Sequence, residues 1–172
     1  MSDNRALFLD RDGIINEDVR YPHLPEHIRF CEGIFDVCRT AAEKGYLLIV
    51  VTNQAGVAKG YYTEDDVVAL HEWMREQFLL QGITITAFYY SPYHNDGTVE
   101  KYVRNSDCRK PNPGMVLRAA GDYDIDIARS LMVGDKESDR ILLPELKSVI
   151  VKSNYTPEKY DVESLNDVIA LL

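Results

Sequence analysis

Apolar and polar positions alternate in blocks along the chain, and their period changes from block to block. Short runs of consecutive apolar residues are typical of strands buried on both faces, and they occur at residues 6–9, 46–51, 130–133 and 147–151. Residues 83–90 alternate and are rich in β-branched and aromatic side chains, which predicts one more strand. The segments between several of these runs carry apolar residues at helical spacing instead.

Helices are predicted from this spacing and from signals at their ends. Residues 32–44 form one helix, for which Gly45 is a plausible C-terminal cap. Thr63 and Asp66 resemble a capping box that opens a second helix, and Gly82 closes it. Asn112-Pro113 provides an N-cap and a proline at the first helical position, so a third helix is predicted to run to about residue 120. Residues 167–172 predict a short terminal helix.

Alternating strands and helices predict the α/β class, as a Rossmann-like parallel sheet with helices on both faces. The chain has 172 residues, of which 45% are hydrophobic, and this suits one domain spanning residues 1–172 with a sizeable core. Residues 91–111 are polar and lack a period, so they are predicted to form a surface excursion beside the site.

The composition limits the kinds of molecule that the protein is expected to bind. A formal net charge of −9 argues against nucleic acid, whereas a small phosphorylated metabolite responds only to the local field of its pocket. The short polar N-terminus and the lack of a long apolar run predict a cytoplasmic protein with no signal peptide and no membrane partner. Three irregularly spaced cysteines make a disulfide framework an unfavoured interpretation. We expect a monomer.

Polar residues follow three of the predicted strands at the point where each strand ends. Asp10 follows the first, Thr52 and Asn53 follow the second, and Asp135 follows the fourth. Because ligands of an open parallel sheet bind beyond the carboxyl ends of its strands, we expect these groups to converge on one crevice.

Asp10 and Asp12 carry the most informative chemistry. Two carboxylates one residue apart after a buried strand repel each other, and a bound Mg²⁺, which prefers carboxylate oxygens, relieves that repulsion. An aspartate can also attack phosphorus, and a second one can protonate the leaving oxygen and then activate water. The alternative is a structural Asx-turn closed by Gly13.

Four ordered motifs give these residues a context: FLDRDG at 8–13, VTNQAG at 51–56, CRKPNPG at 108–114 and VGDKESD at 133–139. With these motifs nearly the whole chain resembles the haloacid dehalogenase superfamily of phosphatases, and within it the branch that includes heptose bisphosphate and histidinol phosphate phosphatases. The resemblance implies a Mg²⁺-dependent sugar-phosphate phosphatase with a minimal cap. The alternative hypothesis is a phosphatase for another small phosphate ester. A third hypothesis is a non-catalytic phosphate-binding scaffold.

The resemblance also implies roles for individual residues. Asp10 would be the nucleophile and a metal ligand, Asp12 the general acid/base with its backbone carbonyl on the metal, and Asp135 the third ligand. Thr52 would hold the transferring phosphoryl group, and Lys110 would neutralise its charge. The remaining predicted substrate contacts are Arg11, Asp18, Tyr21, Asn53, Gln54, Arg109 and Lys136.

Asp139 and the histidines each allow a functional and a structural interpretation. Asp139 is either an acid just behind the metal or a charge on a helix surface. The four histidines, His71 among them, are taken as ordinary surface or half-buried residues.

Members of this branch often bind a structural zinc ion before the CRKP motif, but of the matching positions here only Cys108 keeps a ligand type, so zinc is not expected. Something else must then order this loop. Candidates are packing among Tyr89, Tyr90, Tyr93 and Tyr102, or pairing among Glu100, Lys101 and Arg104.

Overall fold

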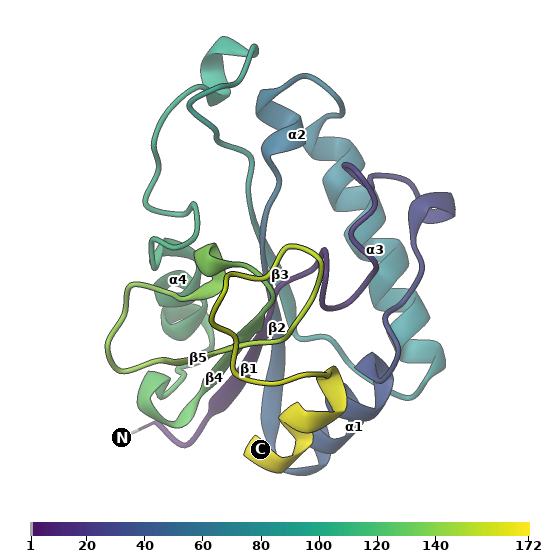
Figure 1. The fold of residues 1–172 in the computed structure, drawn as a ribbon, viewed down its shortest axis with the longest axis vertical. Helices are drawn as coiled ribbons and strands as arrows, with labels where there is room; N and C mark the ends of the chain where they lie inside the picture. Colours follow the sequence, from purple (N-terminus) through teal and green to yellow (C-terminus); the bar gives the residue numbers. More distant parts are fainter. Residues whose placement is uncertain (1) are drawn as a thin grey trace.

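The computed structural model describes residues 2–172 and contains one five-stranded sheet (Figure 1). All pairings are parallel, and the strand order is β3-β2-β1-β4-β5. The strands are β1 (Arg5–Leu9), β2 (Tyr46–Asn53), β3 (Ala87–Ser91), β4 (Leu131–Gly134) and β5 (Lys147–Ile150). The predicted α/β class with a parallel sheet is therefore confirmed.

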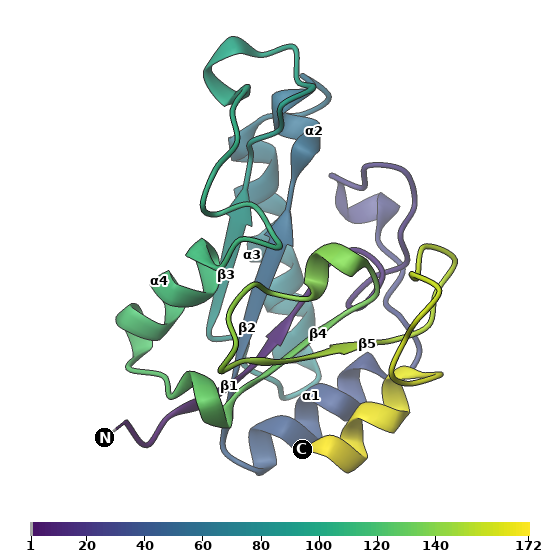
Figure 2. The same cartoon turned by 60° about the vertical axis from the view of Figure 1, so that its left-hand side comes forward.

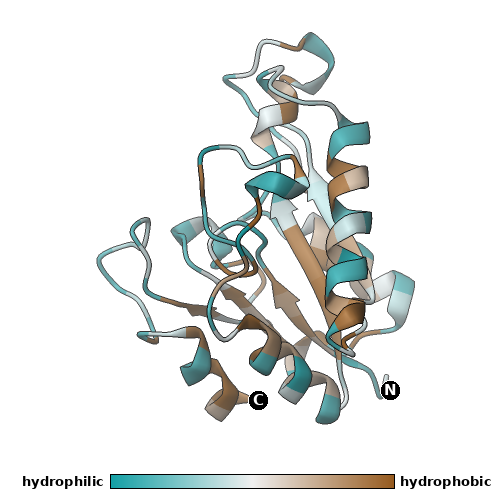
Figure 3. Ribbon diagram, turned by 90° about the vertical axis from the view of Figure 1, so that its right-hand side faces the viewer, coloured by the Kyte–Doolittle hydropathy of each residue, from teal (hydrophilic) through white to brown (hydrophobic). Residues whose placement is uncertain are grey.

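Successive strand residues point to opposite faces of the sheet, and each face has its own apolar cluster. Leu7 and Leu9 of β1 pack with α1 (Ile34–Glu43), α3 (Glu64–Leu80) and the C-terminal 3₁₀ helix η5 (Leu165–Leu171). Ala6 and Phe8 pack on the other side with α4 (Gly114–Tyr123). Figure 2 shows α4 on one side of the sheet and α1 with η5 on the other. The helices change between hydrophobic and hydrophilic within each turn, while the central strands are hydrophobic (Figure 3).

Three of the predicted helix ends are confirmed, at Gly45, at Gly82 and at the Thr63–Asp66 capping box. Gly45 and Gly82 follow α1 and α3 with φ values of 85° and 73°, a left-handed conformation that glycine adopts without strain. The Thr63 side chain accepts from the Asp66 backbone N–H at 3.2 Å, and the Asp66 carboxylate accepts from the Thr63 N–H at 2.8 Å. This reciprocal capping box fixes the start of α3 at Glu64.

Two local predictions are wrong in detail. The strand expected from residue 83 begins only at Ala87, because pairing with β2 starts where the Thr86 N–H donates to the Leu48 carbonyl oxygen. Ile83 and Ile85 are buried as expected, but in coil. Asn112 does not cap α4, since its side-chain amide donates to the Ser106 carbonyl oxygen at 3.0 Å and the helix begins at Gly114.

The excursion between β3 and α4 projects beyond the sheet and lies beside α2 (Ala55–Ala58) in both views (Figures 1 and 2). The backbone N–H groups of Thr98 and Val99 donate to the Ala58 carbonyl oxygen at 2.8 and 2.9 Å. The remaining short 3₁₀ helices are η1 (Pro25–His27), η2 (Glu100–Tyr102), η3 (Ile127–Arg129) and η4 (Glu137–Asp139). Within residues 2–172, no helix combines the length and the apolarity needed to cross a membrane.

Candidate active site

A cavity of about 280 Å³ opens at the carboxyl ends of the central strands, where the sequence predicted a crevice. Most of the side chains predicted to form the site line it: Asp10, Asp12, Asp18, Tyr21, Thr52, Asn53, Gln54, Arg109, Lys110 and Lys136. Arg20, Ala55, Tyr62, Ser138, Asp139 and Tyr155 also line it. Arg11 and Asp135 do not line it, and both are buried directly behind its wall.

Asp10 lies one residue beyond β1 and is held there by its backbone N–H, which donates to the Val133 carbonyl oxygen of β4 at 3.0 Å. The Lys110 ammonium donates to Asp10 Oδ1 at 2.8 Å and to Asp139 Oδ1 at 2.6 Å. Burial raises the pKa of Asp10 to about 8, and the Asp139 carboxylate reinforces that shift while Lys110 opposes it. The pocket therefore holds more negative charge than Lys110 alone offsets.

Asp135 follows β4, and its side chain is fully buried. Its Oδ2 accepts from the Ser153 hydroxyl at 2.7 Å, whereas its Oδ1 has no hydrogen-bond partner among residues 2–172. Burial raises the pKa of Asp135, and the Ser153 hydrogen bond opposes the rise. Gly13 allows this approach, because a Cβ at that position would lie 2.4 Å from Asp135 Oδ2.

Asp139 proves to belong to the interior of the site rather than to a helix surface. Its Oδ2 accepts from the backbone N–H groups of Asp135 and Lys136 at 3.0 and 3.1 Å, while Oδ1 faces Lys110. Gly134 makes room for it, since a Cβ there would lie 2.1 Å from the Asp139 carboxyl carbon. Of its two proposed interpretations, the structure supports the buried acid.

Three carboxylates provide a set of oxygen atoms that suits a divalent cation. One ligand atom from each of Asp10, Asp135 and Asp139 lies within 4.8 Å of the other two. The unpartnered buried Asp135 Oδ1 is the kind of atom that a metal ion satisfies. Hard oxygen donors are the ligands of Mg²⁺, and a cation here would stabilise the charged form of Asp10, whose pKa is raised first by burial and then by the Asp139 carboxylate. The residues therefore fit magnesium.

The side-chain amide of Asn53 makes two hydrogen bonds to the backbone of Lys110. Asn53 Oδ1 accepts from the Lys110 backbone N–H at 2.9 Å, and Asn53 Nδ2 donates to the Lys110 carbonyl oxygen at 3.1 Å. This pair ties the end of β2 to the loop before α4 and so aims Lys110 at Asp10. Thr52, buried beside it, accepts from Gln54 Nε2 at 2.9 Å and presents its side chain to the cavity.

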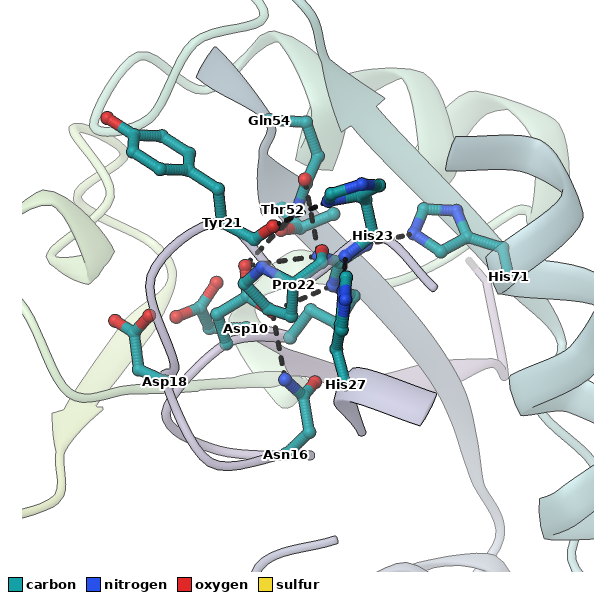
Figure 4. A network of polar contacts seen from close by, with 12 residues as sticks. Asp10, Asn16, Asp18, Tyr21, Pro22, His23, His27, Thr52, Gln54 and His71 are labelled. Atoms are coloured by element: carbon teal, nitrogen blue, oxygen red, sulfur yellow. Dashed lines mark hydrogen bonds and ion pairs between the residues drawn. The ribbon is translucent and has the colours of Figure 1, made fainter. Parts of the chain in front are cut away.

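Arg11 is buried and does not line the cavity, although the sequence suggested a substrate contact. Its Nε donates to Asp12 Oδ1 at 2.9 Å, and its NH2 group lies 3.2 Å from Asp12 Oδ2. Figure 4 shows Asn16, Gln54 and His71 reaching toward this centre from three different segments. In this geometry Arg11 supports the carboxylate of Asp12.

The outer rim combines charges and aromatic rings. Lys136 donates to Asp18 Oδ2 at 2.8 Å, and its ammonium lies 5.2 Å from the centre of the Tyr155 ring. Tyr21, with a φ of 53°, accepts from the Lys59 ammonium at 2.9 Å. Arg109 donates to the Tyr93 carbonyl oxygen at 3.2 Å, which links the rim to the excursion. Tyr155 carried no signal in the sequence, because it lies in a loop far from every motif.

Cys108, the one residue of a zinc-ligand type that remains, lies among hydroxyl groups. Its Sγ is 3.1 Å from Ser106 Oγ and 3.4 Å from Ser91 Oγ. The thiols of all three cysteines are free. The excursion is instead tied to α3, because the hydroxyls of Tyr90 and Tyr102 donate to the two oxygens of Glu64 at 2.8 and 2.6 Å.

Comparison with known sequences agrees with this architecture. A family model described as HAD-hydrolase-like matches residues 107–142. The chain is 51% identical over 136 residues to D-glycero-α-D-manno-heptose-1,7-bisphosphate 7-phosphatase from Burkholderia mallei, covering 79% of this chain and 72% of that protein. It is 43% identical over 134 residues to D-glycero-β-D-manno-heptose-1,7-bisphosphate 7-phosphatase from Yersinia pestis, covering 78% of this chain and 71% of that protein.

Solved structures resemble it as well. A HAD-like protein from Mesorhizobium loti superposes with a TM-score of 0.86 at 30% identity, covering 99% of this chain and 86% of that one. The D,D-heptose 1,7-bisphosphate phosphatase from B. bronchiseptica superposes with a TM-score of 0.78 at 24% identity, covering 97% of each chain. The chain therefore belongs to the haloacid dehalogenase superfamily, in the family of phosphatases that its curated relatives represent. As a member of that family, it is a phosphomonoester hydrolase.

Proposed function

We propose that this enzyme removes the 7-phosphate of D-glycero-D-manno-heptose 1,7-bisphosphate in a Mg²⁺-dependent reaction, with Asp10 as the covalent nucleophile. The observation that carries the proposal is the position of Asp10. It faces the cavity, it contacts the Lys110 ammonium at 2.8 Å, and it lies within reach of two further carboxylates. A group in this place can meet a phosphoryl group while its own charge is balanced.

Asp10, Asp12 and Asp135 would hold the magnesium ion, as the motifs imply, with Asp139 close behind. When bound, Mg²⁺ supplies positive charge that balances the transferring phosphoryl group. A crystal structure of the B. bronchiseptica phosphatase was obtained with magnesium and phosphate, which supports this cofactor for a chain of the same fold.

The reaction takes place in two displacements. An Asp10 carboxylate oxygen bonds to phosphorus as the P–O ester bond breaks, and Asp12 gives its proton to the departing sugar oxygen. Water then attacks the aspartyl-phosphate, Asp12 takes back a proton, and the bond between Asp10 and phosphorus breaks. Inorganic phosphate leaves, and both carboxyl groups return to their starting states. Lys110 and Thr52 hold the phosphoryl oxygens throughout.

The substrate is inferred from the relatives and from the charge of the rim. Relatives named for either anomer of the heptose bisphosphate align with more than three quarters of this chain, at 51% and 43% identity. Arg20 and Arg109 line the same cavity as Asp10, and their positive charge suits the second phosphate of a bisphosphate. Arg109 is fixed toward it by its contact with Tyr93.

Phosphate release from a panel of esters, with Mg²⁺ or with a chelator, tests the proposal. The panel contains both anomers of heptose 1,7-bisphosphate, histidinol phosphate and several hexose phosphates. We expect Mg²⁺-dependent turnover of one heptose anomer well above all other esters. Preference for another ester would replace the substrate and keep the chemistry, while turnover that is unaffected by chelator would contradict the metal requirement. Lack of turnover on the whole panel would contradict the proposed substrate.

A further inference from the structure

Arg11 is a charged side chain with only 1% of its surface exposed, and a buried guanidinium is costly unless its N–H groups are paired. Two of its nitrogens face the two oxygens of Asp12 at 2.9 and 3.2 Å. The NH2 group also faces the Pro22 carbonyl oxygen at 2.9 Å and Gln54 Oε1 at 3.2 Å. These acceptors come from three separate segments, so the position of the guanidinium is determined by tertiary packing.

Among residues 2–172, the remaining nitrogen, NH1, has one hydrogen-bond partner, which is His71 Nε2 at 3.2 Å. His71 lies on α3 with 4% of its surface exposed and stacks on Phe88, with ring centres 4.6 Å apart. Burial and the positive charge of Arg11 hold the pKa of His71 well below its usual value, so the ring is neutral. Because Arg11 can only donate, Nε2 is the acceptor and the ring proton is on Nδ1.

We propose that His71 is a positioning residue for the reaction, which fixes Asp12 by accepting the last hydrogen bond of Arg11. The inference rests on the proposed role of Asp12 as general acid/base. The guanidinium is a rigid planar fork, so a change at NH1 turns the two nitrogens that hold the Asp12 carboxylate. Proton transfer depends closely on the geometry of the acid, and a misplaced Asp12 protonates the departing sugar oxygen poorly.

A comparison of two phosphate esters distinguishes a misplaced Asp12 from a general loss of structure. An alkyl phosphate releases a strongly basic alkoxide and needs the proton from Asp12, whereas p-nitrophenyl phosphate releases a weakly basic phenolate that needs little help. A defect in positioning Asp12 should therefore reduce the first step with the sugar phosphate more than with the aryl phosphate. A structural defect of the pocket should reduce both equally.

The experiment compares kcat/KM for these two esters in His71→Leu, His71→Gln and the unmodified enzyme. For His71→Leu we expect a loss of about tenfold or more on the sugar phosphate and a clearly smaller one on p-nitrophenyl phosphate. His71→Gln keeps an acceptor and should recover most of the difference. Met74→Leu changes the same buried face of α3 without touching Arg11, and it should leave both values unchanged. Equal losses on the two esters, or unchanged values in His71→Leu, would overturn the proposal.

A second measurement is independent of turnover. In urea unfolding, His71→Leu should shift the midpoint less when Asp12 has been replaced by alanine than in the unmodified chain, because both residues act on Arg11. Additive shifts would overturn the link between His71 and Asp12. If the unmodified enzyme hydrolyses neither ester, the proposed function fails. Coupled shifts of the urea midpoint would then still support the contacts from His71 through Arg11 to Asp12.

Discussion

Lys110 is the residue whose surroundings set the charge of the site. Its ammonium is buried between the carboxylates of Asp10 and Asp139, and Asp135 lies close to both. One positive charge among three buried carboxyl groups leaves an excess of negative charge. That excess adds to burial, which is the main cause of the raised pKa of Asp10. A divalent cation removes that excess, and this is the physical reason to expect metal dependence.

Asp10→Asn tests the nucleophile. The amide has nearly the same shape but cannot form an aspartyl-phosphate, so we expect turnover to fall by more than about a thousandfold. Steady-state phosphate release provides the measurement, and a preserved cooperative urea transition shows that the fold is intact. Asp36→Asn, at an exposed carboxylate of α1, is the matched control and should retain full activity. Substantial turnover in Asp10→Asn would rule out the covalent mechanism.

Ser153→Ala tests the support of Asp135, the proposed third metal ligand. The Ser153 hydroxyl holds Oδ2 at 2.7 Å, and removing it frees the carboxylate to rotate. Loss of such a supporting hydrogen bond weakens metal binding by about tenfold or more, and titration calorimetry with Mg²⁺ measures it directly. Ser153→Thr keeps a hydroxyl and should bind Mg²⁺ nearly as the unmodified protein does. Equal affinities in all three proteins would show that Ser153 has no part in the site.

At the scale of elements, the first turn of α3 anchors the excursion that carries Arg109. Glu64 accepts from the hydroxyls of two tyrosines, Tyr90 at the end of β3 and Tyr102 in η2. Tyr93 and Tyr102 also pack on each other, with ring centres 6.1 Å apart. Of the tyrosine packing that the sequence suggested, the structure contains the Tyr93–Tyr102 pair. The carboxylate that joins Tyr102 to Tyr90 comes from a helix that had no predicted link to the loop.

Glu64→Ala should loosen this attachment. Two hydrogen bonds to a charged acceptor are lost, and we expect a decrease of about 2 kcal/mol in the free energy of unfolding. Hydrogen exchange of residues 94–105 should become faster, while exchange in the sheet stays slow. Asp65→Ala removes a neighbouring charge from the same helical turn without a contact to the loop, and it separates this effect from the helix dipole. Similar exchange rates in the two variants would contradict the anchoring role.

At the scale of the whole molecule, the buried neutral His71 links stability to pH. Its pKa is lowered in the folded state, so between about pH 6.5 and that lower pKa the unfolded chain binds a proton that the folded chain does not. Stability is therefore full above about pH 6.5 and is lost as the pH falls.

Urea unfolding at pH 7.5 and pH 5.5 measures this link. The unmodified protein should lose about 1 kcal/mol more than His71→Gln over that interval, since glutamine does not titrate. His94→Gln, at a less buried histidine whose pKa is lowered more weakly, is the control and should behave much as the unmodified protein does. Identical pH dependence in His71→Gln and the unmodified protein would show that His71 titrates normally in the folded state.

The sequence by itself determined the sheet, most helix ends and the convergence of the site. Hydrophobic period and capping residues are local, and in a parallel sheet every strand presents its carboxyl end at the same edge. Asp10, Thr52 and Asn53 could therefore be assigned to one cavity from the sequence alone. The four motifs added the order in which these groups occur.

Only the tertiary structure decided which side chains support the site from behind. Arg11 and His71 lie 60 residues apart, and their contact depends on how α3 packs against the loop after β1. Ser153 and Glu64 lie outside every motif. Asn112 was predicted to cap α4, but its side chain contacts Ser106 instead. A pattern along the chain records which residues are buried or cap a helix, whereas a hydrogen bond between distant segments depends on distances and angles that packing alone sets.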